Sequence, residues 1–155
     1  RPDLVRAAWA YEPPYAPVGP PSVRTALAAV ARRTAEAHDR GGHPAAAEAF
    51  LSAVSGEDAL AALPPAARER VRAAGRGVLA DAALLGLEPG GIARIGCPVV
   101  LAGGGESPPL YAQLMDALAA RIPRVSVERL EGVGHGAPIS HPGLVAASIE
   151  AFAAR

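Results

Sequence analysis

One histidine has the setting of a catalytic side chain. His135 lies between two glycines in the run Gly132-Val133-Gly134-His135-Gly136. Glycines allow the backbone to turn sharply and leave room for a substrate beside the imidazole. A histidine in such a loop can act as a general base if a carboxylate lies behind it and orients its ring. Without that partner the pattern describes only a solvated loop histidine, so the elements around it must decide.

The elements on both sides of His135 predict parallel α/β structure. Residues 98–102 form an apolar run closed by three glycines, which is typical of a buried parallel strand. Residues 109–120 have apolar side chains at helical spacing, and residues 125–130 alternate as a strand does. Proline at position 142 predicts the first turn of an amphipathic final helix. His135 therefore follows the carboxyl end of a strand, where open α/β sheets hold their ligands and catalytic groups.

The first 92 residues predict one strand followed by a helical insert. Residues 4–11 favour a buried strand that ends before Pro13, because proline cannot donate to a ladder. Ser22 is a natural N-cap for a helix over 23–38. A Gly-Gly pair at 41–42 breaks that helix, a second helix follows over 44–54, and a third covers roughly 65–85 with kinks at Gly75 and Gly77.

Together these patterns predict an α/β fold with three parallel strands, flanking helices and an inserted helical cap, because helices between strands favour a parallel sheet. The predicted organisation is a core strand in residues 1–18, a cap or lid in 19–92, and the remaining core strands and helices in 93–155.

The composition excludes several classes of protein. Half of the 155 residues are apolar, 19% are charged and the formal net charge is zero, which fits neither a disordered chain nor a nucleic-acid-binding surface. Cys97 is the single cysteine, so no internal disulfide forms and a cytoplasmic location is expected. No stretch has the length of a membrane span. A metal site is not expected, since His38 and His43 have no acid or cysteine at ligand spacing.

Three segments in order resemble the C-terminal half of an α/β-hydrolase. Residues 1–14 are similar to the strand that follows the nucleophile-bearing helix, and residues 95–108 to the strand that usually leads to the catalytic acid. Residues 130–138, followed by a helix that ends near Phe152, are similar to the catalytic-histidine loop and the last helix of that family. The resemblance covers residues 1–18 and 93–155. It implies that His135 is the catalytic histidine.

The resemblance leaves two candidates for the carboxylate that orients His135. At the usual position of the acid this chain has Ser107, which has no charge to stabilise an imidazolium, and Glu106 is adjacent. A second position used in the family, at the end of the preceding strand, is occupied by Glu12. We prefer Glu12 and keep Glu106 as the alternative. If neither residue orients His135, Glu12 would accept hydrogen bonds from the amides of its turn. Glu106 would then be a solvated charge that the dipole at a helix N-terminus favours.

The resemblance also indicates what these residues lack. The family's nucleophile lies in a Gly-x-Ser-x-Gly turn, and none of the seven serines of this sequence does. Because the family order is nucleophile, acid, histidine, we expect the nucleophile upstream of Arg1 and the isolated 155 residues to be inactive. We also expect them to self-associate through an unpaired apolar sheet edge.

The function implied is that of a serine-type hydrolase acting on an ester or similar small acyl substrate, with no cofactor and without nucleic-acid or membrane partners. The alternative is a non-catalytic module that binds a small molecule on the same fold. Ser107 favours the alternative, whereas a carboxylate at Glu12 argues against it.

Overall fold

The computed structural model describes residues 4–84 and 91–154, which fall into two compact units. The core unit comprises Arg1–Pro20 and Pro89–Arg155, and the helical unit comprises Pro21–Glu88. The boundaries of the helical unit therefore lie within a few residues of the expected insert at 19–92. Its role as a cap stays a prediction, and each unit is described by itself below.

The core unit is built on a parallel sheet of three strands in the order β1-β2-β3. These are β1 (Ala8–Tyr11), β2 (Val99–Gly104) and β3 (Val125–Leu130). Ala8 pairs with Val99, and Val99 pairs with Val125. Every residue of the central strand β2 is buried, as expected for a parallel strand covered on both faces. The predicted fold class, three parallel strands with flanking helices, is confirmed.

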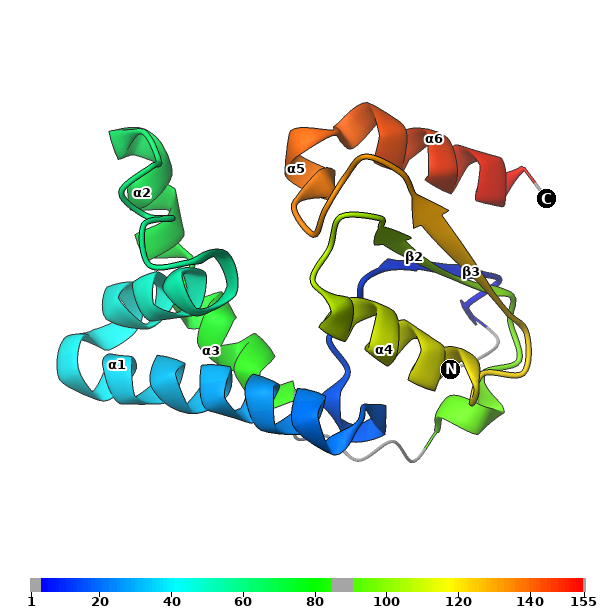
Figure 1. Ribbon diagram of the computed structural model, residues 1–155, viewed down its shortest axis with the longest axis horizontal. Helices are drawn as coiled ribbons and strands as arrows, with labels where there is room; N and C mark the ends of the chain where they lie inside the picture. The colour runs from blue at the N-terminus through cyan, green and yellow to red at the C-terminus, as the bar shows by residue number, and fades with distance from the viewer. Residues whose placement is uncertain (1–3, 85–90, 155) are drawn as a thin grey trace. The chain divides into compact units, whose positions relative to one another are not determined.

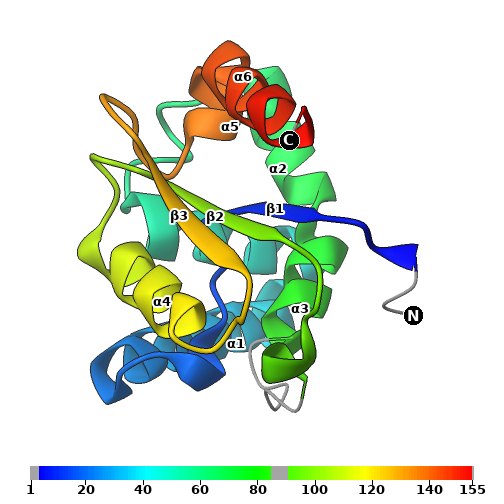
Figure 2. The ribbon, with the colours of Figure 1, turned by 90° about the vertical axis from the view of Figure 1, so that its right-hand side faces the viewer.

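Helices cover both faces of this sheet (Figures 1 and 2). Helix α4 (Pro109–Ala119) lies on one face and α6 (Pro142–Ala153) on the other. Side chains of β1 alternate between the two faces, so Ala8 and Ala10 pack on the α4 side while Trp9 and Tyr11 pack on the α6 side. The buried cluster on the α4 side consists of Val18, Val99, Leu101, Met115, Leu118 and Ile122. The cluster on the α6 side consists of Leu130, Val133, Ala137 and Val145.

Several predicted boundaries in the core unit are wrong. Strand β1 begins at Ala8, not at residue 4, because the preceding Leu4 and Val5 are exposed and do not pair with β2. Strand β2 continues through Gly103 and Gly104, which pair with β3, although the glycines were expected to end it at residue 102. Three short helices were not predicted: η2 (Ala16–Val18), η3 (Ile92–Arg94) and α5 (Ala137–Ser140).

The helical unit consists of α1 (Pro21–Ser55), α2 (Pro65–Ala73) and α3 (Gly75–Leu84). The predicted break occurs inside α1, where Gly41 and Gly42 leave the helical conformation. Ser22 is not an N-cap, because α1 already begins at Pro21. The predicted third helix is in fact two helices, α2 and α3, separated at Ala74.

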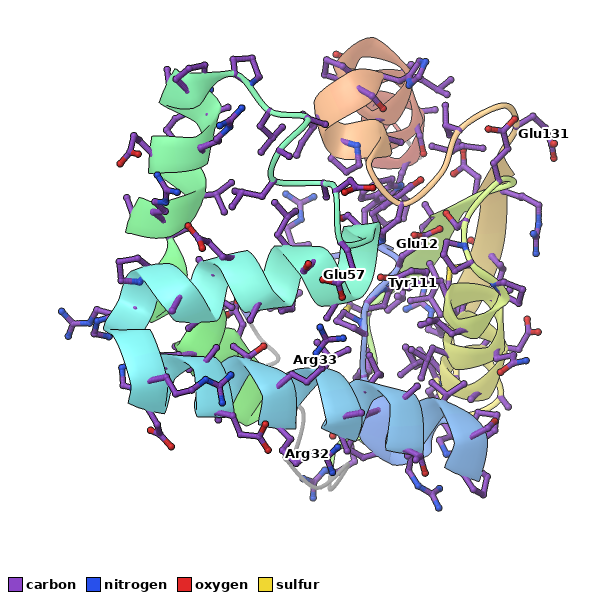
Figure 3. All side chains as sticks on the ribbon, turned by 60° about the vertical axis from the view of Figure 1, so that its left-hand side comes forward. Glu12, Arg32, Arg33, Glu57, Tyr111 and Glu131 are labelled. Atoms are coloured by element: carbon purple, nitrogen blue, oxygen red, sulfur yellow. The ribbon has the colours of Figure 1, made fainter. Side chains whose placement is uncertain are left out.

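Close packing and ion pairs join the three helices of this unit. Gly75 touches the backbone of α1 so closely that a Cβ atom there would overlap the carbonyl oxygen of His43. Arg72 of α2 forms ion pairs with Glu48 of α1 and with Glu69. Arg33 of α1 hydrogen-bonds Glu57, which follows the same helix (Figure 3). Within the described residues we find no helix whose length and hydropathy would let it span a bilayer.

Candidate active site

The structure brings His135 and Glu12 into direct contact. The Nδ1 atom of His135 lies 2.7 Å from Oε2 of Glu12. The Glu12 side chain is fully buried, whereas the His135 side chain remains 46% exposed. An ionised carboxylate can only accept hydrogen bonds, so the contact favours the imidazole tautomer with its proton on Nδ1. That tautomer leaves Nε2, on the other side of the ring, as a free base.

Glu12 reaches this position from the carboxyl end of β1. Its N–H donates to the carbonyl of Ala102 at 2.8 Å, which extends the β1–β2 ladder by one residue. Its φ of 42° places the backbone in the left-handed region, which non-glycine residues adopt rarely and at some cost. The second carboxylate oxygen, Oε1, accepts a hydrogen bond of 2.8 Å from the N–H of Gly104. Two charge-assisted hydrogen bonds thus hold the carboxylate, as a buried charge requires.

The loop that carries His135 is tied to both neighbouring strands. Gly132 turns the chain out of β3 with a φ of 70°. The carbonyl of Val133 accepts a hydrogen bond from the N–H of Glu106 at 2.9 Å, and the hydroxyl of Tyr11 donates to the carbonyl of Gly134 at 2.7 Å. The residues immediately before His135 are therefore held by hydrogen bonds to their carbonyl oxygens, which do not depend on the His135 side chain.

Tyr111, in the first turn of α4, stacks on the imidazole of His135. The two ring centroids are 4.1 Å apart and the ring planes differ by 11°. Burial of the phenol, and next the nearby charge of Glu12, raise the pKa of Tyr111 above its ordinary value. Figure 3 shows Glu12 and Tyr111 close to one another in the core unit. Sequence reasoning missed Tyr111, although an aromatic residue shortly after the carboxyl end of a buried strand is a usable signal.

Two glycines of β2 allow the site to assemble. A Cβ atom on Gly103 would collide with the side chain of Met115 and approach Oε1 of Glu12 to 3.1 Å. A Cβ atom on Gly104 would overlap the carbonyl oxygen of Val133 and lie 2.8 Å from the hydroxyl oxygen of Tyr11. These positions need glycine for close approach, since neither has an unusual positive φ.

Among the described residues, neither a hydrogen bond nor an ion pair joins the alternative acid or its neighbour to His135. Glu106 is exposed, and its backbone N–H donates a hydrogen bond to the carbonyl of Val133. The Ser107 hydroxyl is buried and makes no hydrogen bond of good geometry within the described residues. Burial, and next the charge of Glu12, raise the pKa of the Tyr11 phenol above its ordinary value. Ser107 lies close enough to Tyr11 to offset part of that increase. Of the two predicted acids, Glu12 is the one that the structure brings to His135.

The remaining histidines do not build a second site. His141 is exposed and hydrogen-bonds the adjacent Ser140 at 2.9 Å. The rings of His38 and His43 meet edge to face with their centroids 4.9 Å apart. Across residues 4–84 and 91–154, no three acidic, histidine or cysteine side chains are placed to share a metal ion.

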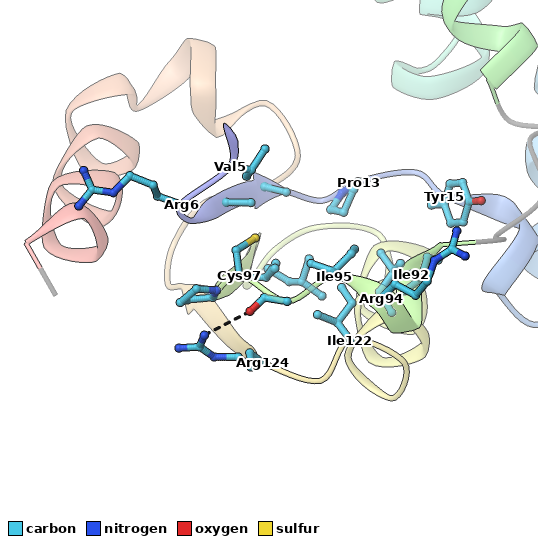
Figure 4. Close-up of a pocket in the computed structure, with 17 residues that line it drawn as sticks. Val5, Arg6, Pro13, Tyr15, Ile92, Arg94, Ile95, Cys97, Ile122 and Arg124 are labelled. Atoms are coloured by element: carbon cyan, nitrogen blue, oxygen red, sulfur yellow. Dashed lines mark hydrogen bonds between the residues drawn. The ribbon is translucent and has the colours of Figure 1, made fainter. Parts of the chain in front are cut away.

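A groove of about 910 Å³ lies on the α4 side of the sheet (Figure 4). Its floor includes Ala8 and Ala10 of β1, and its lining also contains three arginines, Arg6, Arg94 and Arg124. Neither Glu12 nor His135 lines it. The groove therefore marks a part of the sheet face that α4 leaves open, separate from the candidate active site.

The comparison with known families agrees with this geometry. The model of the family described as "Alpha/beta hydrolase family" matches residues 3–148, nearly the whole chain. The chain belongs to the alpha/beta hydrolase family. The expected family membership is thus confirmed, and it rests on a match that spans the sheet, the helical unit and the histidine loop.

Two solved structures resemble this alpha/beta hydrolase chain. One is an alpha/beta hydrolase from Sphaerobacter thermophilus DSM 20745, with 24% identity and a TM-score of 0.60, covering 96% of this chain and 58% of that protein. The other is a thermophilic esterase from Thermogutta terrifontis with malate bound, with 23% identity and a TM-score of 0.64, covering 97% of this chain and 56% of that protein. At this identity the likeness shows the fold. A comparison with curated proteins gives no significant match.

Proposed function

We propose that this chain contributes the general base and its orienting acid to a hydrolase that acts on esters or similar small acyl compounds. The observation that carries the proposal is the 2.7 Å contact between a buried carboxylate, Glu12, and a half-exposed imidazole, His135. Membership of the alpha/beta hydrolase family supports hydrolysis as the reaction class. The chain spans less than two thirds of the solved structures it resembles, one of which is named as an esterase.

In the proposed mechanism, Nε2 of His135 accepts the proton of a serine hydroxyl as its oxygen attacks the acyl carbon. The carboxylate of Glu12 stabilises the imidazolium that forms. The imidazolium then gives its proton to the departing alkoxide, which leaves as an alcohol. Water attacks the acyl-enzyme in the same way, and the acid product and the free serine are released. We assign the serine to a part of the protein outside these 155 residues, since no serine here lies in a Gly-x-Ser-x-Gly turn.

The second candidate function is a non-catalytic module that binds a small molecule. The feature in its favour is Ser107, an uncharged residue at the position where the resemblance to the family places the acid. That argument is weakened by the position of Glu12, whose carboxylate is buried against His135 at a strained backbone position. A buried ionised group that served no purpose would be costly to retain.

Hydrolysis of p-nitrophenyl acetate and butyrate by the protein expressed from its gene, with any sequence that precedes residue 1, tests the proposal. We expect His135→Gln and Glu12→Gln each to lower kcat by roughly 10²–10⁴-fold with little change in KM. The first change removes the base, the second removes the charge that orients and stabilises it, and neither removes a group proposed to bind substrate. His141→Gln and Glu106→Gln are the matched controls and should stay within about twofold of the parent. Loss of activity in Glu106→Gln but not in Glu12→Gln would assign the acid to Glu106. An inactive parent would favour the binding module.

A further inference from the structure

We propose that Tyr111 is a positioning residue for His135, a role that rests on the proposed function of the Glu12–His135 pair. The need for such a residue follows from the geometry of the pair. A single hydrogen bond from Nδ1 to Glu12 fixes one atom of the imidazole. Rotation of a histidine ring about its last side-chain bond is broad and has no sharp minimum. With 46% of its side chain exposed, His135 has few other contacts that could fix the plane of its ring.

The stack on Tyr111 supplies the missing restraint. Two rings 4.1 Å apart and within 11° of parallel define the imidazole plane, and the Glu12 contact then fixes rotation within that plane. Together they set the direction in which Nε2 points. Tyr111 can impose this restraint because it is itself held firmly. It is only 8% exposed, and its N–H donates to the carbonyl of Pro108 at 3.1 Å in the first turn of α4.

The same stack places the face of Tyr111 against the ring that carries the proton in the proposed mechanism. The face of an aromatic ring carries negative electrostatic potential, which attracts a cation within about 6 Å of the centroid. An imidazolium at His135 would therefore be stabilised from its edge by Glu12 and from its face by Tyr111. Because burial and the charge of Glu12 raise the pKa of Tyr111, its phenol stays neutral at the pH values at which a histidine acts as a base. Tyr111 thus assists in orienting the base and in holding the proton that the base receives.

Nuclear magnetic resonance of the protein expressed from its gene, with any sequence that precedes residue 1 and with its histidines labelled, tests this role. Ring protons of His135 lie over the face of Tyr111, so ring current should displace them upfield. We expect Tyr111→Phe to keep this displacement and the single tautomer with its proton on Nδ1, because it keeps the ring. Tyr111→Leu should lose the displacement, and the ring-nitrogen signals of His135 should show a mixture of both tautomers, because the ring is no longer held against Glu12. The exposed His141 is an internal reference whose signals should stay unchanged in every variant. Assignment follows from the signals that disappear in His135→Gln.

A folded Tyr111→Leu variant whose His135 nitrogen signals still report one tautomer would refute the proposal. If that variant does not fold, the parent itself decides, because stacked rings must give nuclear Overhauser contacts between Tyr111 and His135, and their absence would equally refute it. Glu12→Gln tests the proposed function separately through the imidazole tautomer. A tautomer that does not respond to Glu12→Gln would reject the role of Glu12, even if the ring displacement by Tyr111 is present.

Discussion

Replacing Gly104 by alanine should separate the histidine loop from the sheet. The added methyl group would overlap the carbonyl oxygen of Val133 and press on the hydroxyl of Tyr11. Neither atom can move freely, because the Val133 carbonyl is bonded to the N–H of Glu106 and the Tyr11 hydroxyl to the carbonyl of Gly134. The loop must therefore move outward and weaken both hydrogen bonds.

The expected loss of stability follows from these contacts. Each of the two neutral hydrogen bonds contributes about 1 kcal/mol, and overpacking of a filled site costs about 1–3 kcal/mol. The free energy of unfolding should therefore fall by about 3–5 kcal/mol. That is a large share of the roughly 5–15 kcal/mol that stabilises an ordinary domain. The N–H of Gly104 also binds Glu12, so the same shift should disturb the carboxylate behind His135.

Urea unfolding followed by circular dichroism measures the loss, with Gly136→Ala as the matched control on the other side of His135. A Cβ atom on Gly136 meets no atom within 4 Å, and its φ of −77° suits alanine. The control should remain within about 0.5 kcal/mol of the parent. If Gly104→Ala proved as stable as the control, the close approach of β2 to the histidine loop would not be required, and the argument for these glycines would be wrong.

Two further predictions concern pH and the helical unit. Burial raises the pKa of Tyr11 and of Tyr111, so above about pH 10 the unfolded chain releases phenolic protons that the folded chain keeps. The free energy of unfolding should then fall as pH rises. Urea titrations between about pH 9 and 11 should show a smaller fall in Tyr111→Phe than in the parent protein. An equal fall would contradict the raised pKa assigned to Tyr111. In the helical unit, Gly75→Ala should lower the melting temperature because its methyl group overlaps the His43 carbonyl. Gly77→Ala, with no atom within 4 Å, should raise it because alanine favours helix, and the reverse order would refute this packing.

The sequence predicts the central elements of the core well because their signals are local. The second and third strands and the helix between them have apolar runs or periodicity bounded by glycine and proline, and they occur where expected as β2, β3 and α4. The start of β1 could not be predicted, because Leu4 and Val5 are as apolar as a strand but have no partner there. The four-residue α5 has too little sequence for any period to appear.

The candidate site is harder to predict because its parts are distant in the chain. Glu12 and His135 are separated by 123 residues, so no spacing could pair them, and only the resemblance to a family suggested it. The stack with Tyr111 depends on how the first turn of α4 faces the loop after β3. The need for Gly103 and Gly104 arises from close approach of other segments, which the sequence expresses only as an unusual run of glycines.

The neighbouring strands explain how the carboxylate of Glu12 reaches His135, as its proposed role requires. Parallel strands end at the same edge of a sheet, and Tyr11 pairs with Ala102, so residue 12 lies beside the end of β2. From there the longer glutamate side chain reaches His135 while Gly104 binds its second oxygen. The buried hydroxyl of Ser107 lies close to Tyr11, whose pKa the charge of Glu12 raises. A carboxylate at residue 107 would therefore add a second negative charge to the same neighbourhood, and like charges placed close together disfavour ionisation of both. One negative charge behind the imidazole is what the proposed chemistry needs, and a neutral serine beside it is consistent with that requirement.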